Sequence, residues 1–224
     1  MLNEDHRVAC VNFAQQNLNR DWSQVIFLDE KTFSSSQDSK LPLWRLDNTR
    51  YEPNHVLYTQ RSGRISVGVF GWILSNGPGE LVQIGGRMNR AQYVRILNDI
   101  LLPGILDRYA HPRPITVVQD NSRMHTCRIV RTWLEAHRDE IEMLPWPAKS
   151  PDLNPIENVW GLTVQQWQDE LPENGFNRNV ENLYGHCNRV WDRLRNDNMC
   201  QNIVDSMRNR LQLVIESNGY PIKY

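Results

Sequence analysis

Short apolar segments alternate with longer amphipathic segments along the chain. The short segments are rich in Val, Ile and aromatic residues and are bounded by turn-forming residues, which is typical of β-strands. They predict strands at residues 25–29, 65–74, 80–84, 115–120 and 141–144. The turn sequence NGPG at 76–79 separates the second strand from the third, so these two are expected to form a hairpin.

The longer segments have apolar residues three or four positions apart, as expected for helices with one buried face. In 89–102, for example, Tyr93, Ile96 and Leu97 recur at this spacing, and Pro103 is expected to end the helix. The same pattern predicts helices within 1–20 and at 123–137, 155–171, 180–194 and 199–216.

The order of these elements predicts the fold. A strand, a hairpin and then alternating helices and strands indicate a mixed β-sheet with helices packed on it. We therefore expect an α/β (α+β) domain of the RNase H-like type with a C-terminal helical extension. The expected division is an N-terminal helix at 1–20, a core at 21–172 and C-terminal helices packed on the core at 173–224.

The composition excludes a membrane-spanning protein and indicates one globular domain. The 224 residues are 40% hydrophobic and 23% charged, the mean hydropathy is -0.60, and no apolar run is long enough to span a bilayer. The first residues lack the basic and then apolar pattern of a secretion signal. The four cysteines have neither CxxC nor zinc-ligand spacing, so reduced thiols in a cytosolic or nuclear protein are expected.

The net charge of -1 argues against a dedicated nucleic-acid-binding protein, which is usually basic. The arginines are nevertheless unevenly distributed. Two clusters stand out, one made of Arg45, Arg50, Arg61 and Arg64 and the other of Arg123, Arg128 and Arg131. Each cluster is compatible with phosphate contacts or simply with solvated surface positions.

Three acidic residues are expected to meet at one edge of the sheet. Asp29 and Asp120 each end a predicted strand. In the sequence SPDLNPIENVW, Asn154 can cap a helix that begins at the following proline and carries Glu157 in its first turn, where the helix dipole favours negative charge. Because strand ends and a helix start can converge at one sheet edge, Asp29, Asp120 and Glu157 form the candidate site.

Three carboxylates suit a site for two divalent cations. Mg²⁺ and Mn²⁺ take oxygen ligands, and two such ions about 4 Å apart can activate the attacking oxygen and stabilise the leaving oxygen of a phosphoryl transfer. A two-carboxylate glycosidase would leave the third acid without a role. With 26 Asp and Glu residues in the chain, some are also expected to end strands by chance.

Three sequence blocks resemble the catalytic signature of mariner-like DNA transposases of the Tc/mariner superfamily, namely LDE at 28–30, VVQDNSRMHT at 117–126 and SPDLNPIENVW at 150–160. The resemblance implies an RNase H-like core of the DDE type. It also implies that Asp29, Asp120 and Glu157 are the catalytic acids, that they bind Mg²⁺ or Mn²⁺, and that Asp29 bridges the two ions. The similarity extends to the C-terminal sequence SNGYPIKY.

The resemblance further assigns supporting or DNA-facing roles to Trp44, Arg45, Asn121, Arg123, His125 and Asn154. Trp44 and Arg45 match the clamp-loop region of the family. A packing role beside the sheet is equally compatible with His125. Glu30 is expected to be solvated or to support a metal ligand rather than to bind metal itself.

Two features depart from the family pattern. The sequence SRM at 122–124 replaces the usual Ala-Pro-Cys, so either Arg123 contacts phosphate or the site has drifted from the family pattern. The spacing between Asp120 and Glu157 is slightly longer than in the best-known members, which suggests a variant subgroup.

By this resemblance the protein is expected to be the catalytic domain of a nuclear transposase that cleaves DNA and integrates it by strand transfer. Transposon ends and target DNA are the expected partners, possible homodimer formation follows from the family's action on paired ends, and no membrane contact is expected. Full-length members carry helix-turn-helix modules before the core, so we expect an N-terminally truncated protein in which 1–20 is the remnant of a linker helix. The alternatives are a catalytically inactive, domesticated DNA-binding or interaction module and a metal-dependent nuclease.

Overall fold

The computed structural model describes residues 3–34, 65–108, 114–169 and 179–224, and a five-stranded sheet lies at its centre. The strand order is β3-β2-β1-β4-β5. The strands are β1 (Val25–Ser34), β2 (Ser66–Leu74), β3 (Gly77–Ile84), β4 (Ile115–Val118) and β5 (Ile141–Met143). Neighbours among β3, β2 and β1 are antiparallel, whereas β1, β4 and β5 run parallel, so the sheet is mixed as predicted.

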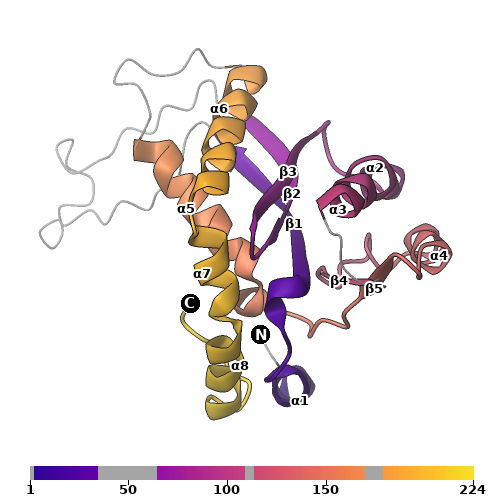
Figure 1. Cartoon of the computed structure of the whole chain (residues 1–224), viewed down its shortest axis with the longest axis vertical. Coiled ribbons are helices and arrows are strands. Elements are labelled where there is room, and N and C mark those ends of the chain that lie inside the picture. The colour runs from indigo at the N-terminus through magenta and orange to yellow at the C-terminus, as the bar shows by residue number, and fades with distance from the viewer. Residues whose placement is uncertain (1–2, 35–64, 109–113, 170–178) are drawn as a thin grey trace, which may run out of the picture.

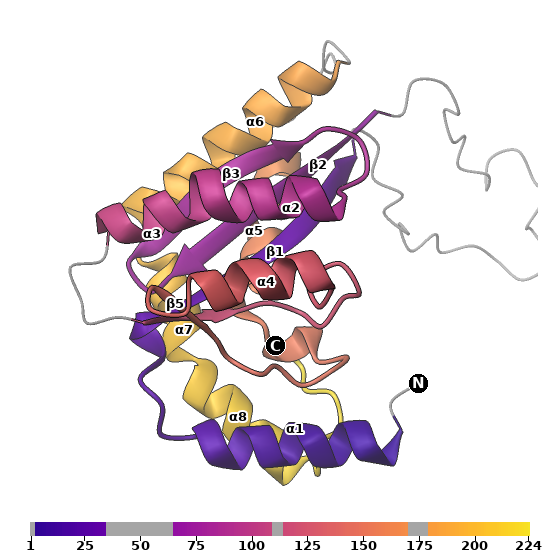
Figure 2. The same ribbon diagram turned by 90° about the vertical axis from the view of Figure 1, so that its right-hand side faces the viewer.

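Helices cover both faces of this sheet (Figure 1). One face carries α2 (Arg90–Ile96), α3 (Leu102–Arg108) and α4 (Arg128–Ala136), and the other carries α5 (Pro155–Asp169), α6 (Val180–Arg193) and α7 (Met199–Asp205). Beyond the end of the sheet, α1 (Glu4–Asn17) packs against α8 (Met207–Glu216) (Figure 2). Short 3₁₀ turns occupy Trp22–Gln24, Pro151–Leu153 and Leu194–Asn196. None of the helices in the described ranges combines the length and the apolar character needed to cross a membrane.

The alternation of side chains along β1 divides the interior into two cores. Ile26 and Leu28 belong to the core beneath α2, α3 and α4. Phe27 instead packs on Trp22 and Trp146 in the core on the side of α5 and α6. The same alternation continues beyond the apolar part of the strand. Asp29 therefore emerges on the α5 side of the sheet, and Glu30 emerges on the α4 side.

Strand β1 is longer than its apolar run predicts, because it continues to Ser34. It pairs with β4 only as far as Phe27, and from Phe27 to Ser34 it pairs with β2. The prediction that Asp29 ends the strand is therefore wrong. Asp29 lies instead just beyond the last residue that pairs with β4, where the parallel part of the sheet ends.

The predicted helix at 89–102 does not end at Pro103. A π-helical turn, Leu97–Leu101, joins α2 to α3, and the helical path continues to Arg108. Proline lacks an N–H group, and its ring would press on the carbonyl of the preceding turn in a regular α-helix. The wider π turn leaves room for that ring, which is why proline is tolerated here.

Three further predicted boundaries are wrong. The helix predicted at 123–137 begins only at Arg128, because 122–127 form turns closed by a hydrogen bond from Thr126 N to Ser122 O (3.1 Å). The helix predicted at 199–216 is two helices, α7 and α8, separated by Ser206. Strand β3 begins inside the predicted turn, at Gly77, whose φ of 127° is readily adopted only by glycine.

Candidate active site

The Asp29 carboxylate lies against α5, and its surroundings favour the protonated form. Trp160 donates a hydrogen bond from its indole Nε1 to Asp29 Oδ2 at 3.2 Å. Burial, followed by the negative charges of Glu157 and Glu30, raises the pKa of Asp29 to about 7. Trp160 can come this close because the β2 partner of Asp29 is Gly71, where a Cβ would lie 2.7 Å from the Trp160 ring.

Asp120 follows β4, and its surroundings favour the ionised form. Its Oδ1 accepts hydrogen bonds from His125 Nδ1 at 2.6 Å and from Ser122 N at 3.0 Å. The bond from His125 is the main cause that lowers the pKa of Asp120. The side chain is 59% exposed, so the carboxylate is accessible as well as charged.

Glu157 lies in the first turn of α5, as predicted, with its Oε2 3.7 Å from Lys31 Nζ. The prediction that the Asn154 side chain caps this helix is wrong, because its buried Oδ1 has no hydrogen-bond partner among the described residues. Asn154 also ends the 3₁₀ turn before the helix, and its N donates to Pro151 O. Its backbone carbonyl, which accepts from Glu157 N at 3.1 Å, closes the first turn instead.

His125 joins Asp120 to Glu30. Its Nε2 lies 2.9 Å from Glu30 Oε1, its side chain is 1% exposed, and its ring packs on Tyr93 with centroids 4.4 Å apart. Burial opposes protonation, but the hydrogen bonds with Asp120 and Glu30 and the charges of both carboxylates raise the pKa of His125 to about 10. The resulting imidazolium ties β1 to the loop after β4 and holds the Asp120 carboxylate in place.

Among the described residues, the remaining candidates form no hydrogen bond or ion pair with the three acids. Asn121 donates from Nδ2 to Trp146 O at 2.5 Å, so it links two loops of the fold. Arg123 is exposed and makes no ion pair with the described residues. Trp44 and Arg45 lie outside the described residues.

The loop before Glu157 is held by a residue that sequence analysis did not select. Arg210 of α8 is 1% exposed and donates from Nη1 to Asn158 Oδ1 at 2.8 Å and to Asp152 O at 3.1 Å. Burial lowers the pKa of this guanidinium to about 10. Asp152 Oδ2 also accepts from Ile222 N at 2.9 Å. The sequence signal that could have found Arg210 is an arginine on the apolar face of an amphipathic helix.

The acids of three elements therefore gather at the edge where the parallel strands end. Asp29 is close enough to Glu157 for its pKa to respond to that charge, and His125 connects Glu30 to Asp120. Within the described ranges, no three His, Cys, Asp or Glu side chains form a complete metal-binding cluster. The chemistry of the donors nevertheless fits a hard divalent cation, because they are carboxylate oxygens and their negative charges crowd around Asp29.

A mixed RNase H-like sheet with acids beside its parallel strands and on a following helix defines a class of phosphoryl-transfer domains. A family model described as DDE superfamily endonuclease matches residues 24–175. The Tc3 transposase of Caenorhabditis elegans is 31% identical over the whole chain, which spans 65% of that relative, and the Tc1 transposase of the same organism is 31% identical with 80% spanned. The chain belongs to the DDE superfamily endonucleases, as a member of their Tc1/mariner transposase branch.

Solved structures of the Mos1 mariner transposase have the same fold. The Mos1 catalytic domain superposes with a TM-score of 0.75 at 18% identity, covering 100% of this chain and 98% of that one. This similarity confirms the predicted RNase H-like fold. Other Mos1 structures that match this chain contain Mn, Mg or the left transposon end in a paired-end complex.

Replacing His125 with asparagine is expected to weaken Mn²⁺ binding about 10–100-fold, because removing a partner that orients a ligand typically has this effect. Glu30→Gln is expected to act in the same direction but less strongly, since His125 would keep its bond to Asp120. Calorimetric Mn²⁺ titration measures both effects. His137→Asn is the matched control, because His137 bonds to Trp133 O rather than to an acid. Unchanged Mn²⁺ affinity in His125→Asn would show that metal binding does not depend on the hydrogen bond from His125 to Asp120.

Proposed function

We propose that this chain cleaves DNA and joins DNA strands by metal-dependent phosphoryl transfer. The observation that carries the proposal is that the Glu157 charge acts on Asp29 and that His125 ties Asp120 to Glu30, the neighbour of Asp29, where the parallel strands of the sheet end. Membership of the DDE endonuclease family supports the same activity. The chain spans less than two thirds of the Tc3 relative, so the activity of the whole protein is inferred from this domain.

Asp29, Asp120 and Glu157 would hold Mg²⁺ or Mn²⁺ through their carboxylate oxygens. When bound, these ions supply Lewis-acid activation of water or a 3′-hydroxyl and charge stabilisation of the leaving oxygen. The Trp160 bond orients the Asp29 carboxylate. Because the pKa of Asp29 lies near 7, a proton competes with metal for it, and metal binding is expected to strengthen as pH rises from about 6 to 8.

The partners and the cellular location follow the same proposal. Transposon ends and target DNA are the substrates we propose, and the Mos1 complexes with a transposon end support this choice. We also propose a homodimer, because a paired-end complex holds two ends together. DNA integration requires chromosomal DNA, so the proposed location is the nucleus.

Calorimetric Mn²⁺ titration of the full chain and of Asp120→Asn tests the proposal. Tight binding to the wild type that is lost in the variant is expected, since two acids offset the charge of the ions less well than three. A nicking assay on a supplied transposon end, with Mn²⁺ and then with EDTA, is expected to give product only with metal. Equal or absent Mn²⁺ binding in both proteins would instead favour an inactive interaction module.

A further inference from the structure

Several arginines without an ion pair or hydrogen bond among the described residues lie near the acids. Several arginines elsewhere are engaged, such as Arg108, whose Nη2 lies 2.7 Å from Glu80 Oε1, and Arg195, whose Nε lies 3.2 Å from Asp192 Oδ1. Seven exposed arginines make no ion pair or hydrogen bond with the described residues, namely Arg87, Arg90, Arg95, Arg123, Arg128, Arg131 and Arg208. Four of them, Arg87, Arg90, Arg123 and Arg128, lie at or just before the starts of α2 and α4, and we call these four the arginine surface.

Two contacts fix the relative direction of α2 and α4, which pack side by side on one face of the sheet (Figure 2). Tyr93 packs on His125 with ring centroids 4.4 Å apart. Further along both segments, Trp133 Nε1 donates to Asn98 Oδ1 at 3.2 Å. Because the residue numbers rise together on both sides, the helices run parallel. Both therefore begin at the end where His125 contacts the acids.

The arginine surface lies at this shared beginning. Arg90 and Arg128 are the first residues of α2 and α4, and Arg87 and Arg123 lie shortly before them. Neither helix has an acidic residue in its first turn, whereas α5 carries Glu157 there. A cation at the amino end of a helix is disfavoured by the helix dipole. The arrangement therefore creates a positive potential next to the carboxylates at some cost in stability.

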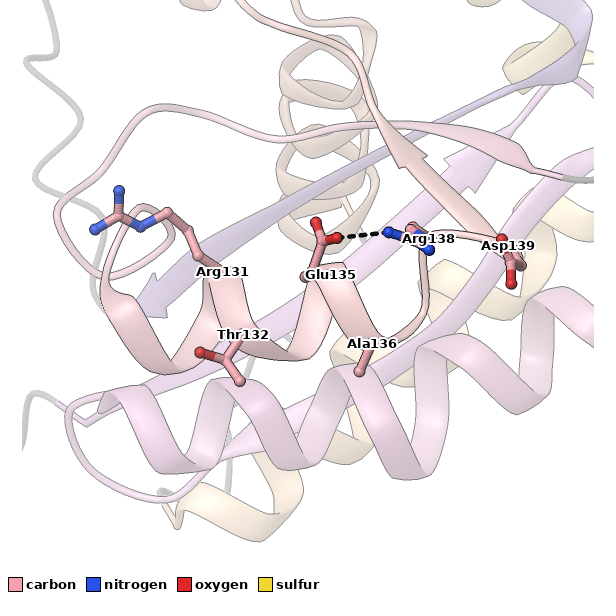
Figure 3. A pocket seen from close by; sticks show the side chains of 6 residues that line it. All are labelled: Arg131, Thr132, Glu135, Ala136, Arg138 and Asp139. Carbon is pink, nitrogen blue, oxygen red and sulfur yellow. Dashed lines mark hydrogen bonds and ion pairs between the residues drawn. The ribbon is translucent and has the colours of Figure 1, made fainter.

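The unpaired positive charge does not extend to the carboxyl end of α4. Figure 3 shows Arg131 pointing away from the rest of the outer face, which continues through Thr132 to the Glu135–Arg138 ion pair (2.9 Å) and Asp139. Charges at the carboxyl end of α4 are thus paired or negative. Arg131 is exposed and also makes no ion pair with the described residues, so the unpaired positive charge on α4 lies in its amino-terminal half, nearer the acids.

We propose that the arginine surface binds the phosphodiester backbone of duplex DNA beside the scissile phosphate. The acids that do the chemistry repel this backbone, and cations next to them offset that repulsion and help to hold DNA over the site. Guanidinium groups pair with phosphate through two parallel hydrogen bonds, which suits arginine to this task. The role of this DNA as substrate rests on the proposed function, whereas the binding itself requires neither metal nor acids.

The test compares two double variants of the full chain with equal net charge. Arg90→Gln/Arg128→Gln removes half of the arginine surface, and Arg208→Gln/Lys223→Gln removes two exposed cations from the C-terminal region. Binding of a fluorescent duplex of arbitrary sequence is measured by anisotropy in EDTA at several salt concentrations. Loss of two phosphate contacts is expected to reduce the slope of log affinity against log salt by about 2 and the affinity itself about tenfold or more. The control is expected to change affinity less than about threefold.

Equal losses of DNA affinity in the two double variants would show that only net charge matters, and this would overturn the proposal. An unchanged slope of log affinity against log salt in Arg90→Gln/Arg128→Gln would overturn it as well. Asp120→Asn is expected to keep the wild-type slope in EDTA. Failure of the proposed function would give a different result. The wild type would then fail to nick DNA with Mn²⁺, while the salt dependence of its DNA affinity would still decrease when the arginine surface was mutated.

Discussion

Replacing Asp29 with asparagine is expected to abolish metal-dependent DNA cleavage, by about 1,000-fold or more, and to stabilise the metal-free chain at pH 8. The stability effect arises from the burial of the Asp29 carboxylate and then from the negative charges of Glu157 and Glu30 beside it. Removing a metal ligand removes charge stabilisation of the transition state. Removing the charge of Asp29 relieves the repulsion and desolvation that raise its pKa to about 7.

The sign of the stability effect follows from the raised pKa. Asp29 keeps its proton in the folded chain up to about pH 7, whereas in the unfolded chain it loses the proton near its ordinary pKa of 3.8. The contribution of the protonated carboxyl group to stability is therefore full below about pH 4 and is lost as pH rises through about 7. Asparagine resembles the protonated acid at every pH. The variant is therefore expected to gain on the order of 3 kcal/mol over the wild type at pH 8 in EDTA, and nothing below pH 4.

Urea unfolding at several pH values measures the gain. The exposed acid Asp139, at the far end of α4, supplies the control Asp139→Asn, which is expected to change neither stability nor cleavage. A variant at Asp29 that loses stability at pH 8 would show that its carboxylate is held by favourable contacts rather than by crowding.

Arg210→Met is expected to destabilise the chain by about 3 kcal/mol and to lower cleavage as well. Methionine fills much of the same volume but leaves the partly buried acceptors Asp152 O and Asn158 Oδ1 without the donor that the buried Arg210 supplies. Each unsatisfied buried acceptor costs about 1–3 kcal/mol. Because Asn158 is the neighbour of Glu157 on α5, the loss is expected to loosen the catalytic carboxylate too.

The exposed neighbour Arg208 gives the matched control Arg208→Met on the same helix, for which urea unfolding is expected to show a change below about 0.5 kcal/mol. Mn²⁺ titration separates the two consequences at Arg210. Weaker metal binding at a temperature where the variant remains folded would show that Arg210 positions Glu157. Equal unfolding midpoints for the two variants would contradict a structural role of the buried guanidinium.

The strands and most helices could be predicted from the sequence because their apolar spacing reflects which face is buried. β1 was predicted too short because its second half, beyond Leu28, is polar, and it is strand only because β2 pairs with it. The helix through Pro103 was missed because one π turn, invisible in the spacing of apolar residues, accommodates the ring. Local patterns thus reveal burial but not the pairing partners that extend an element.

The candidate acids could be selected from the sequence because Asp29 and Asp120 each follow a buried apolar run and Glu157 lies in the first turn of a helix. Their electrostatic differences could not, since the pKa of Asp29 depends on Trp160 and Glu157, which are distant in sequence. The hydrogen bond from His125 to Glu30 was missed for the same reason. Asn154 looked like a cap, but the 3₁₀ turn before it directs its backbone, not its side chain, to the helix.

The opposite directions of Asp29 and Glu30 along β1 have a consequence for insertions and deletions. A one-residue slip of this strand against β2 would exchange the two layers that its side chains enter. Glutamate would then face Trp160, and His125 would lose its second carboxylate. The apolar pair Phe27 and Leu28, each buried in a different core, opposes such a slip, because it would bury each of them on the wrong side. Length changes within β1 are therefore expected to be far more damaging than substitutions at its exposed positions.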